Sequence, residues 1–352
     1  MRPRVAFFIA VCFVLAVPQR HPLDCQALHP SLEETMKRRH VSWLLGGLFI
    51  AGTQSLCAQP TPPAELKHSA DPAALSRHIT YLSSLSRHHE NPAGLDTAAA
   101  YIKAQIEQFG LPCAYQNYSV HAQAYRNVVC TLNPGKSDSV IVGAHYDSYR
   151  DLPGADDNAS GTAGVIELAR LLKAQEASLP QQVELVAYTL EEPPFFRSEH
   201  MGSAVHAQSL SMRPVNVKAV VILEMIGHYS DEAVQNYPLS IMRAVYPKQG
   251  NFIAAVGNWQ SKKLTRQYCH HMQALQQLPC ERLTAPSSLT GVDFSDHLNY
   301  WARKIPAIML TDTSFYRNKN YHTEHDTLDK LDMHKAAAVV NGVATWLQQG
   351  VH

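Results

Sequence analysis

Residues 137–148 read SDSVIVGAHYDS, an apolar run that ends in polar side chains. This pattern is typical of a strand that is buried on both faces and emerges at one edge of a sheet. Similar strand-like stretches recur at 182–192, 217–227, 251–257 and 305–313, with helical stretches between them. The alternation predicts an α/β fold, a three-layer sandwich with a mixed, largely parallel central sheet.

Helical periodicity and two further strands fill the rest of the chain. Asp71-Pro72 begins the first helix, because a capping residue is followed by proline in the first turn. The other elements are two strands near 113–120 and 125–132 and helices at 95–109, 161–175, 201–210, 258–278 and 327–349. Neither a repeat nor a linker interrupts the sequence after residue 70. We therefore expect one catalytic domain over 71–352, preceded by a linker at 59–70.

The N-terminal region contains two signal-like segments in series. The first, within residues 1–35, has two arginines and then an apolar run from Val5 to Val17. The second, 36–58, has a basic start, a short apolar run and small residues before Ala58, as a secretory signal peptide has. We expect translation to start at Met36, with 1–35 an upstream extension, and the product to be periplasmic or secreted. The alternative is a short buried helix or a membrane anchor, although both apolar runs are short for a bilayer.

Composition and cysteine content agree with an exported protein and exclude other classes. The 352 residues carry a formal net charge of zero, which is unlike a nucleic-acid-binding protein. No apolar run is long enough to predict a membrane span in the mature chain. Cys113 and Cys130 flank a hairpin-like stretch and could pair across two strands, which leaves Cys269 and Cys280 to pair by elimination. Free buried thiols are the alternative.

Histidines and carboxylates recur where the predicted strands end. In open α/β sheets, ligands bind beyond the carboxyl ends of the strands, so these side chains are expected to converge. Imidazole nitrogen and carboxylate oxygen are zinc ligands, and two metals can share one carboxylate while another accepts a proton from water. The residues concerned are His145, Asp147, Asp156, Asp157, Glu191, Glu192, Glu224, His322 and His325.

The residue spacing suggests roles for some of these side chains. Adjacent Glu191 and Glu192 could divide the tasks of proton acceptor and metal ligand. His145-x-Asp147 fits the pattern in which a carboxylate orients a ligating imidazole. Asp296 and His297 could support the same site or have no part in it. The motifs H-E-x-x-H, G-x-S-x-G, the Walker loop and G-x-G-x-x-G do not occur.

Four other features have simpler interpretations. Asp156 is expected to cap a helix without binding metal, and Asp326 to cap the last helix. His325 and the RHH sequence at 87–89 are expected to be solvated.

The ordered motifs GAHYDS, GADDNASG, YTLEE, LEM and YHTEHDT resemble those of the co-catalytic zinc exopeptidases of peptidase family M28. That family contains leucyl aminopeptidases, plasma glutamate carboxypeptidase and glutaminyl cyclases, and the resemblance covers roughly residues 90–345. It implies two Zn²⁺ ions per chain and Glu191 as the general base. The ligands that it implies are His145 and Glu224 for one zinc, Glu192 and His322 for the other, and Asp157 as the bridge.

Two departures from the family pattern are visible. Glu224 stands where the family usually has aspartate, which affects the geometry or occupancy of its zinc. The sequence EEPPFFRSEHMGS at 191–203 replaces a glycine-rich continuation, and its Phe195, Phe196 and Arg197 are expected to shape the substrate pocket or, for the two phenylalanines, to pack in the core.

The resemblance implies hydrolysis of a peptide bond at a chain end, and aminopeptidase activity is the commonest in the family. The rivals are a single-zinc glutaminyl cyclase-like acyltransferase, a carboxypeptidase or dipeptidase, and a non-catalytic binding domain. Arg197 could hold a substrate carboxylate or pair with a surface acid.

Overall fold

The computed structural model describes residues 68–351. The predicted upstream extension (1–35), the predicted signal peptide (36–58) and all but three residues of the predicted linker (59–70) lie outside the described residues. Within the described part of the chain, none of the helices is long and apolar enough to cross a bilayer.

The centre of the fold is an eight-stranded sheet with the strand order β1-β2-β4-β3-β5-β8-β6-β7. The strands β3, β4, β5 and β8 are parallel neighbours in the middle. On one side β2 runs antiparallel to both β1 and β4, and on the other side β6 runs antiparallel to β8 but parallel to β7. The prediction of a mixed, largely parallel sheet is confirmed. The strands are β1 Cys113–Val120, β2 Gln123–Leu132, β3 Asp138–His145, β4 Gln182–Tyr188, β5 Asn216–Glu224, β6 Ile253–Gly257, β7 Cys280–Thr284 and β8 Ala307–Thr311.

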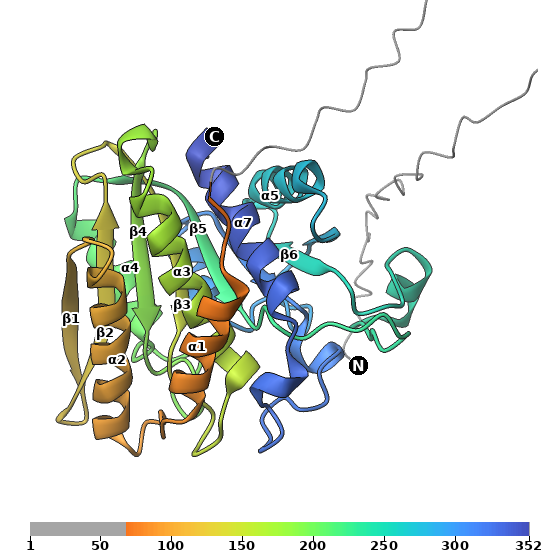
Figure 1. Ribbon diagram of the computed structural model, residues 1–352, viewed down its shortest axis with the longest axis horizontal. Helices are drawn as coiled ribbons and strands as arrows, with labels where there is room; N and C mark the ends of the chain where they lie inside the picture. The colour runs from red at the N-terminus through yellow and green to blue at the C-terminus, as the bar shows by residue number, and fades with distance from the viewer. Residues whose placement is uncertain (1–67, 352) are drawn as a thin grey trace, which may run out of the picture. The chain divides into compact units, whose positions relative to one another are not determined.

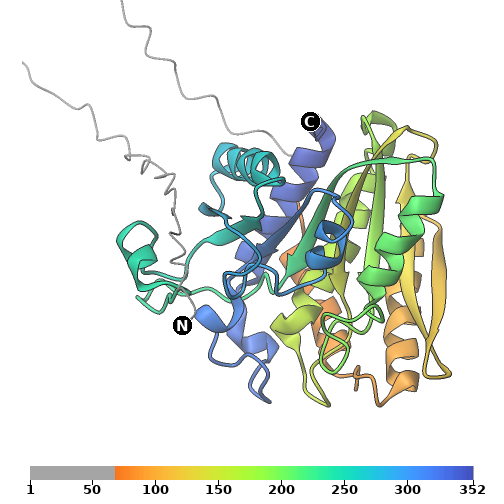
Figure 2. The ribbon, with the colours of Figure 1, turned by 180° about the vertical axis from the view of Figure 1, so that it is seen from behind.

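Helices cover both faces of this sheet, as a three-layer sandwich requires. Figure 1 shows α1, α2, α3, α5 and α7 in front of the strands, and Figure 2 shows two shorter helices, α4 and α6, on the opposite face. The helices are α1 Pro72–Ser83, α2 Pro92–Glu107, α3 Gly161–Lys173, α4 Gly202–Ser209, α5 Lys262–Leu275, α6 His297–Trp301 and α7 Met333–Gln349.

Side chains alternate between the two faces along each central strand. On β5, Val221 and Leu223 pack in the core beneath the larger helical layer. Val220 and Ile222 pack beneath α4 and α6. Because both faces are covered, these strands are continuously apolar until they reach the edge where Glu224 ends β5.

Several predicted boundaries differ from the structure. The last helix begins at Met333 and not at 327, because Asp332 accepts hydrogen bonds from the first backbone N–H groups of the helix. The prediction that Asp326 caps this helix is therefore wrong. The short strand β7 and the five-residue α6 were not predicted, since neither is long enough to show periodicity.

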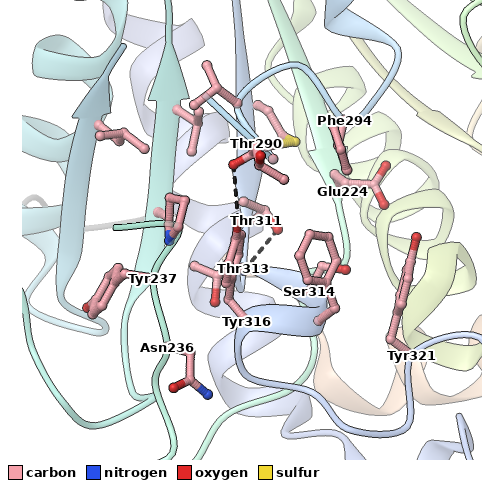
Figure 3. A pocket seen from close by; sticks show the side chains of 18 of the residues that line it. Glu224, Asn236, Tyr237, Thr290, Phe294, Thr311, Thr313, Ser314, Tyr316 and Tyr321 are labelled. Carbon is pink, nitrogen blue, oxygen red and sulfur yellow. Dashed lines mark hydrogen bonds between the residues drawn. The ribbon is translucent and has the colours of Figure 1, made fainter. Parts of the chain in front are cut away.

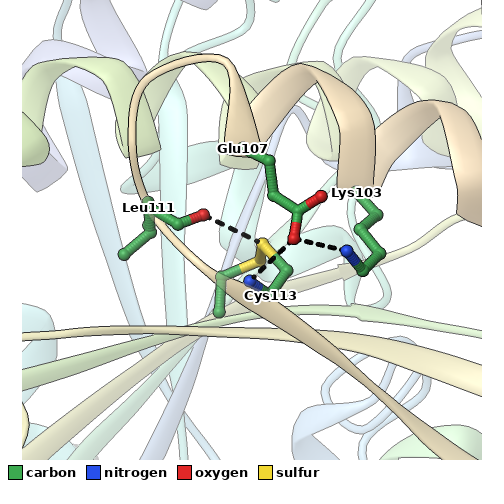
Figure 4. The surroundings of a disulfide bond; sticks show 5 residues. Lys103, Glu107, Leu111 and Cys113 are labelled. Carbon is green, nitrogen blue, oxygen red and sulfur yellow. Dashed lines mark hydrogen bonds and ion pairs between the residues drawn. A yellow bond between two sulfur atoms is a disulfide. The ribbon is translucent and has the colours of Figure 1, made fainter.

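Both predicted disulfide pairings are present. Cys113 and Cys130 lie opposite each other in the β1–β2 register, and Cys269 of α5 bonds to Cys280 at the start of β7. Figure 4 shows the surroundings of the first bond, where Glu107 of α2 accepts hydrogen bonds from the backbone N–H of Cys113 and from Lys103. The bond therefore joins the outer hairpin to itself, close to the end of α2.

Candidate metal centre and active site

Three parallel strands bring their carboxyl ends to one edge of the sheet. His145 ends β3, Glu224 ends β5, and Glu191 and Glu192 follow β4 after two residues. All four residues are buried, with 1 to 7% of their surfaces exposed. Sequence-distant groups thus meet where the strand pattern predicted that they would.

A first group consists of His145, Asp157 and Glu224. His145 Nε2 lies 3.3 Å from Asp157 Oδ1 and 3.4 Å from Glu224 Oε2. One nitrogen or oxygen atom of each residue falls within 4.8 Å of the others, a spacing that suits a single cation.

A second group shares Asp157 with the first. His322 Nε2 lies 3.0 Å from the other oxygen of this carboxylate, Asp157 Oδ2, and 3.3 Å from Glu192 Oε2. Since each oxygen of Asp157 faces a different histidine, this carboxylate has the geometry of a bridge between two cations.

The charge and hydrogen bonding of these groups fit divalent cations. Four buried carboxylates, those of Asp157, Glu191, Glu192 and Glu224, face two histidines, so two dications would neutralise them. Glu192 Oε1 and His322 Nε2 are buried, yet within residues 68–351 neither makes a well-directed hydrogen bond. Buried polar atoms without hydrogen bonds within the protein are suited to act as metal ligands.

The burial and crowding of charged groups in this cluster also shift the pKa values of Glu192 and His322. Burial, reinforced by the charge of Asp157, raises the pKa of Glu192 to about 8. Burial would lower the pKa of His322, but the close carboxylates of Asp157 and Glu192 raise it to about 10. The cluster therefore retains protons that bound cations would displace.

Asp147 positions the glutamate pair. Its two carboxylate oxygens accept hydrogen bonds from the backbone N–H groups of Glu191, at 3.2 Å, and Glu192, at 3.1 Å. His145 Nδ1 lies 3.1 Å from the Asp147 carbonyl oxygen and 3.4 Å from its Oδ1. With Nδ1 occupied in this way, Nε2 remains as the nitrogen that can bind a cation.

The GADDNASG loop, which carries Asp157, is held by residues that the sequence did not identify. Asp326 accepts hydrogen bonds from the backbone N–H groups of Asp156 and Asp157 through its two carboxylate oxygens. Arg87 is fully buried and donates to the carbonyl oxygens of Pro153 and Gly154, so its predicted solvation is wrong. Only the long-range packing of α1 and the 321–327 loop against this segment shows these roles.

Asp156 does not cap a helix, contrary to the prediction. It is fully buried, and its Oδ1 accepts the backbone N–H of Gly227 at 2.9 Å. Its Oδ2 accepts from Asn318 at 3.0 Å. Asp156 belongs to neither of the two groups of candidate ligands. It stabilises the loop from beneath, while its neighbour faces the histidines.

Glu224 is fixed by hydrogen bonds to its distal oxygen. Ser295 Oγ donates to Glu224 Oε2 at 2.7 Å, and Asn158 Nδ2 lies 3.4 Å from the same oxygen. The longer side chain that replaces aspartate in the family pattern is thus constrained to approach His145.

The remaining sequence candidates fall into two sets. His325 is 72% exposed in its side chain, as predicted. Asp296 and His297 are fully buried behind the site. Burial raises the pKa of Asp296 to about 7, against the opposing charge of His145. Asp296 is therefore close enough to influence the cluster electrostatically, which favours a supporting role over no role.

Aromatic rings fix the plane of the His322 imidazole. Tyr149 stacks on one side with ring centroids 3.9 Å apart, and Tyr321 stacks with centroids 3.8 Å apart. Neither tyrosine was a sequence candidate: Tyr321 directly precedes His322 in the chain, whereas Tyr149 comes from a separate loop.

An apolar cavity of about 220 Å³ opens from this centre. Figure 3 shows Glu224 and Tyr321 at one side, Tyr237 at the other, and Thr311 and Tyr316 between them. The lining includes Phe252, Val256, Leu283, Val292, Phe294, Met309 and Phe315 together with the acidic side chains of the centre.

The 191–203 loop contributes to the rim of this cavity. Phe196 lines the cavity and contacts Phe294 edge-on, whereas Phe195 packs against the main core. Arg197 forms two hydrogen bonds to the Asp293 carboxylate, at 2.7 and 2.8 Å, and lies over both Phe196 and Phe294. Its guanidinium is thus engaged with an acid of the protein.

Comparisons with known proteins agree with this architecture. Residues 127–347 match the model of peptidase family M28. The uncharacterized protein YfbL of Escherichia coli K12 is 46% identical over 297 residues, which cover 81% of this chain and 90% of the relative. Leucine aminopeptidase 1 of Pyrenophora tritici-repentis is 26% identical, covering 76% of this chain and 67% of that protein.

Two solved structures share the fold. The LapA aminopeptidase of Legionella pneumophila superposes with a TM-score of 0.65 at 19% identity, over 82% of this chain and 77% of that one. The glutaminyl cyclase of Porphyromonas gingivalis superposes with a TM-score of 0.63 at 17% identity, over 80% and 99%.

Proposed function

The chain belongs to peptidase family M28, and from this premise we propose that it is an exported aminopeptidase that holds two zinc ions. The observation that carries the proposal is the shared carboxylate of Asp157, whose two oxygens face His145 and His322 separately. A single-metal site would have no use for this arrangement.

The proposed ligands follow the two groups of side chains. His145 and Glu224 would hold one Zn²⁺, Glu192 and His322 the other, and Asp157 both. When bound, such a pair supplies Lewis acidity toward a carbonyl oxygen and lowers the pKa of a bound water.

Glu191 is proposed as the general base. It belongs to neither ligand group, yet it lines the cavity, and its Oε2 lies 4.0 Å from His145 Nε2. Burial raises its pKa well above the usual range, although the charge of His145 opposes this shift. A buried carboxylate in this position can take a proton from water and return it to the leaving amine.

The charges around the cavity favour an aminopeptidase over a carboxypeptidase. Among the described residues that line the cavity, no lysine or arginine lies at the candidate metal centre where it could bind a substrate carboxylate, since Arg282 lines the far end. Arg197, the sequence candidate for binding a substrate carboxylate, is paired with Asp293.

Replacing the proposed base tests the mechanism. Glu191→Gln should lower kcat on amino-acid 4-nitroanilides by about 100-fold or more, because proton transfer contributes about 10²–10⁴-fold to rates. Zinc content should stay at two per chain. Glu324→Gln is the matched control, since Glu324 is 81% exposed on the loop after His322. Undiminished hydrolysis by Glu191→Gln would refute the assignment.

The same preparation distinguishes the rival functions. A glutaminyl cyclase-like enzyme would bind one zinc and convert N-terminal glutamine of a peptide to pyroglutamate, whereas the proposed enzyme binds two and releases the N-terminal residue. Dipeptides and carboxyl-blocked peptides separate dipeptidase and carboxypeptidase activity from aminopeptidase activity.

Export is supported by the two disulfides, which are typical of oxidising compartments. N-terminal sequencing of the protein from a periplasmic or culture fraction tests it. A chain that retains residues 37–50 would contradict cleavage near Ala58.

A further inference from the structure

The register of the sheet aligns four residues in one row from the metal centre to the far edge. Glu224 pairs with Thr311, Thr311 with Ala254, and Ala254 with Glu281, across the adjacent strands β5, β8, β6 and β7. Three strand-to-strand steps of roughly 4.8 Å therefore separate Glu224 from Glu281, about 14 Å in all.

The whole row faces the cavity. Ala254, Val256 and Met309 pack in the cluster that lies beside the cavity, and Leu283 packs against it. Because side chains two residues apart share a face of a strand, Thr311 follows Met309, and Glu281 follows Leu283, onto this face. Glu224, Thr311, Ala254 and Glu281 all belong to the cavity lining.

The two ends of the row are acidic and its middle is not. Thr311 and Ala254 are small and leave the space above them open, while Glu224 and Glu281 stand at opposite ends. Aromatic rings flank the distal part, where Tyr237 and Tyr246 have centroids 5.6 Å apart. The cavity is thus a mostly apolar channel that runs from the metal centre to a second carboxylate.

The Glu281 carboxylate has no partner in the described part of the chain. Between residues 68 and 351, no hydrogen bond or ion pair engages its side chain, although it is partly buried. Burial raises its pKa, which the neighbouring Arg282 opposes. Arg282 is exposed and also belongs to the cavity lining, but strand alternation directs its side chain away from that of Glu281. A partly buried, unpaired acid costs stability that a bound cation would recover.

We propose that Glu281 determines specificity by binding the cationic end of a lysine or arginine side chain at the N-terminus of the substrate. The inference rests on the proposed aminopeptidase function. An extended lysine side chain spans roughly 6 Å between Cα and Nζ, from five bonds of about 1.5 Å each. With the α-amino group and scissile carbonyl at the metal centre, this length covers less than half of the row, and a hydrogen bond of about 3 Å together with the Glu281 side chain, which lines the cavity from the other end, covers much of the remainder. The aliphatic stem would lie against Tyr237 and the apolar lining, as long cationic side chains do elsewhere.

The test uses two substrates that differ only in the terminal charge. Lysine and norleucine have side chains of closely similar shape, and their 7-amido-4-methylcoumarin derivatives are compared by kcat/KM on the full protein. The wild type should prefer lysine over norleucine by about tenfold or more, since a hydrogen bond to a charged group contributes about 1.5–3 kcal/mol. Glu281→Gln should reduce this ratio by about tenfold. Glu232→Gln, which removes an exposed charge outside the cavity lining, should leave the ratio as it is.

Two results overturn the proposal: a wild-type preference for norleucine or leucine, or a ratio that Glu281→Gln does not change. If the wild type hydrolyses neither substrate, the aminopeptidase function fails and the pocket is tested by calorimetric binding of L-lysinamide and L-norleucinamide. Preferential binding of lysinamide that Glu281→Gln removes would then support the role of Glu281. Equal binding, or none, would refute it.

Discussion

Replacing the shared carboxylate of Asp157 should remove more zinc than replacing a ligand of one site alone. Asp157→Asn leaves one oxygen where two faced different histidines, at 3.3 Å from His145 Nε2 and 3.0 Å from His322 Nε2. The amide nitrogen cannot bind a cation, and the negative charge is lost from both sites. Glu192→Gln and Glu224→Gln each alter one site. Asp157→Asn should therefore deplete both zincs, and each glutamate variant only one.

The size of the effect follows from the linkage between binding and folding. Substituting a residue outside the ligand set typically costs 10–100-fold in metal affinity, so loss of a ligand should cost about 100-fold or more per site. At a fixed zinc concentration, a 100-fold loss of affinity lowers the stabilisation by bound zinc by about 2.7 kcal/mol per site, and by about 5 kcal/mol for both sites. For a domain of this size the melting temperature should fall by about 10 °C in Asp157→Asn and by about half that in either glutamate variant.

The assay measures zinc per chain by elemental analysis after dialysis, with thermal unfolding in the same buffer. Asp151→Asn is the matched control, because Asp151 is exposed and close in sequence to the same loop. A chelator should lower the melting temperature of the wild type to near that of Asp157→Asn. The reasoning is refuted if Asp157→Asn keeps two zincs, or loses no more than Glu192→Gln and Glu224→Gln do.

Two further predictions concern stability away from the metal centre. Burial alone would raise the pKa of Glu184, but hydrogen bonds from His206 and Arg213 outweigh it and lower the pKa to about 2. A carboxylate whose pKa is lower in the folded than in the unfolded state stabilises the fold at pH values above the unfolded-state pKa. Glu184→Gln should therefore lower the unfolding free energy, measured with urea, by about 3 kcal/mol at pH 7 and by progressively less below pH 4.5. A loss that is the same at pH 7 and pH 3 would contradict this reasoning. Serine at both Cys113 and Cys130 should lower the unfolding free energy by about 3 kcal/mol, given the sequence separation of 17 residues, whereas an unchanged denaturation midpoint would show that the bond is dispensable.

Strand-end chemistry was predictable because it is local. A strand buried on both faces is apolar throughout, so His145 and Glu224 are conspicuous where β3 and β5 end. The parallel direction of neighbouring strands then places their ends at one edge without further information. The same reasoning identified Glu191 and Glu192, since both follow β4 after only two residues.

The residues that hold the loop of Asp157 in place could not be predicted from local sequence patterns. Asp326 has the sequence context of a helix cap, yet Asp332 performs that role and Asp326 holds the loop of Asp157. Arg87 has the context of a solvated helix end, yet it is buried against the same loop. In each case the decisive hydrogen bonds join segments more than 60 residues apart, which no local pattern encodes.

The sequence by itself determined the layers of this protein, the identity of the buried strands and the acids and histidines at their ends, because the alternation and termination of strands are properties of neighbouring residues. The tertiary structure alone decided that Asp157 faces two histidines and that Glu224 and Glu281 share one row. The order β5-β8-β6-β7 is not the order of the chain. Strand order and register are set by packing and pairing between distant segments, so the residues that become neighbours across the sheet are known only once it has formed.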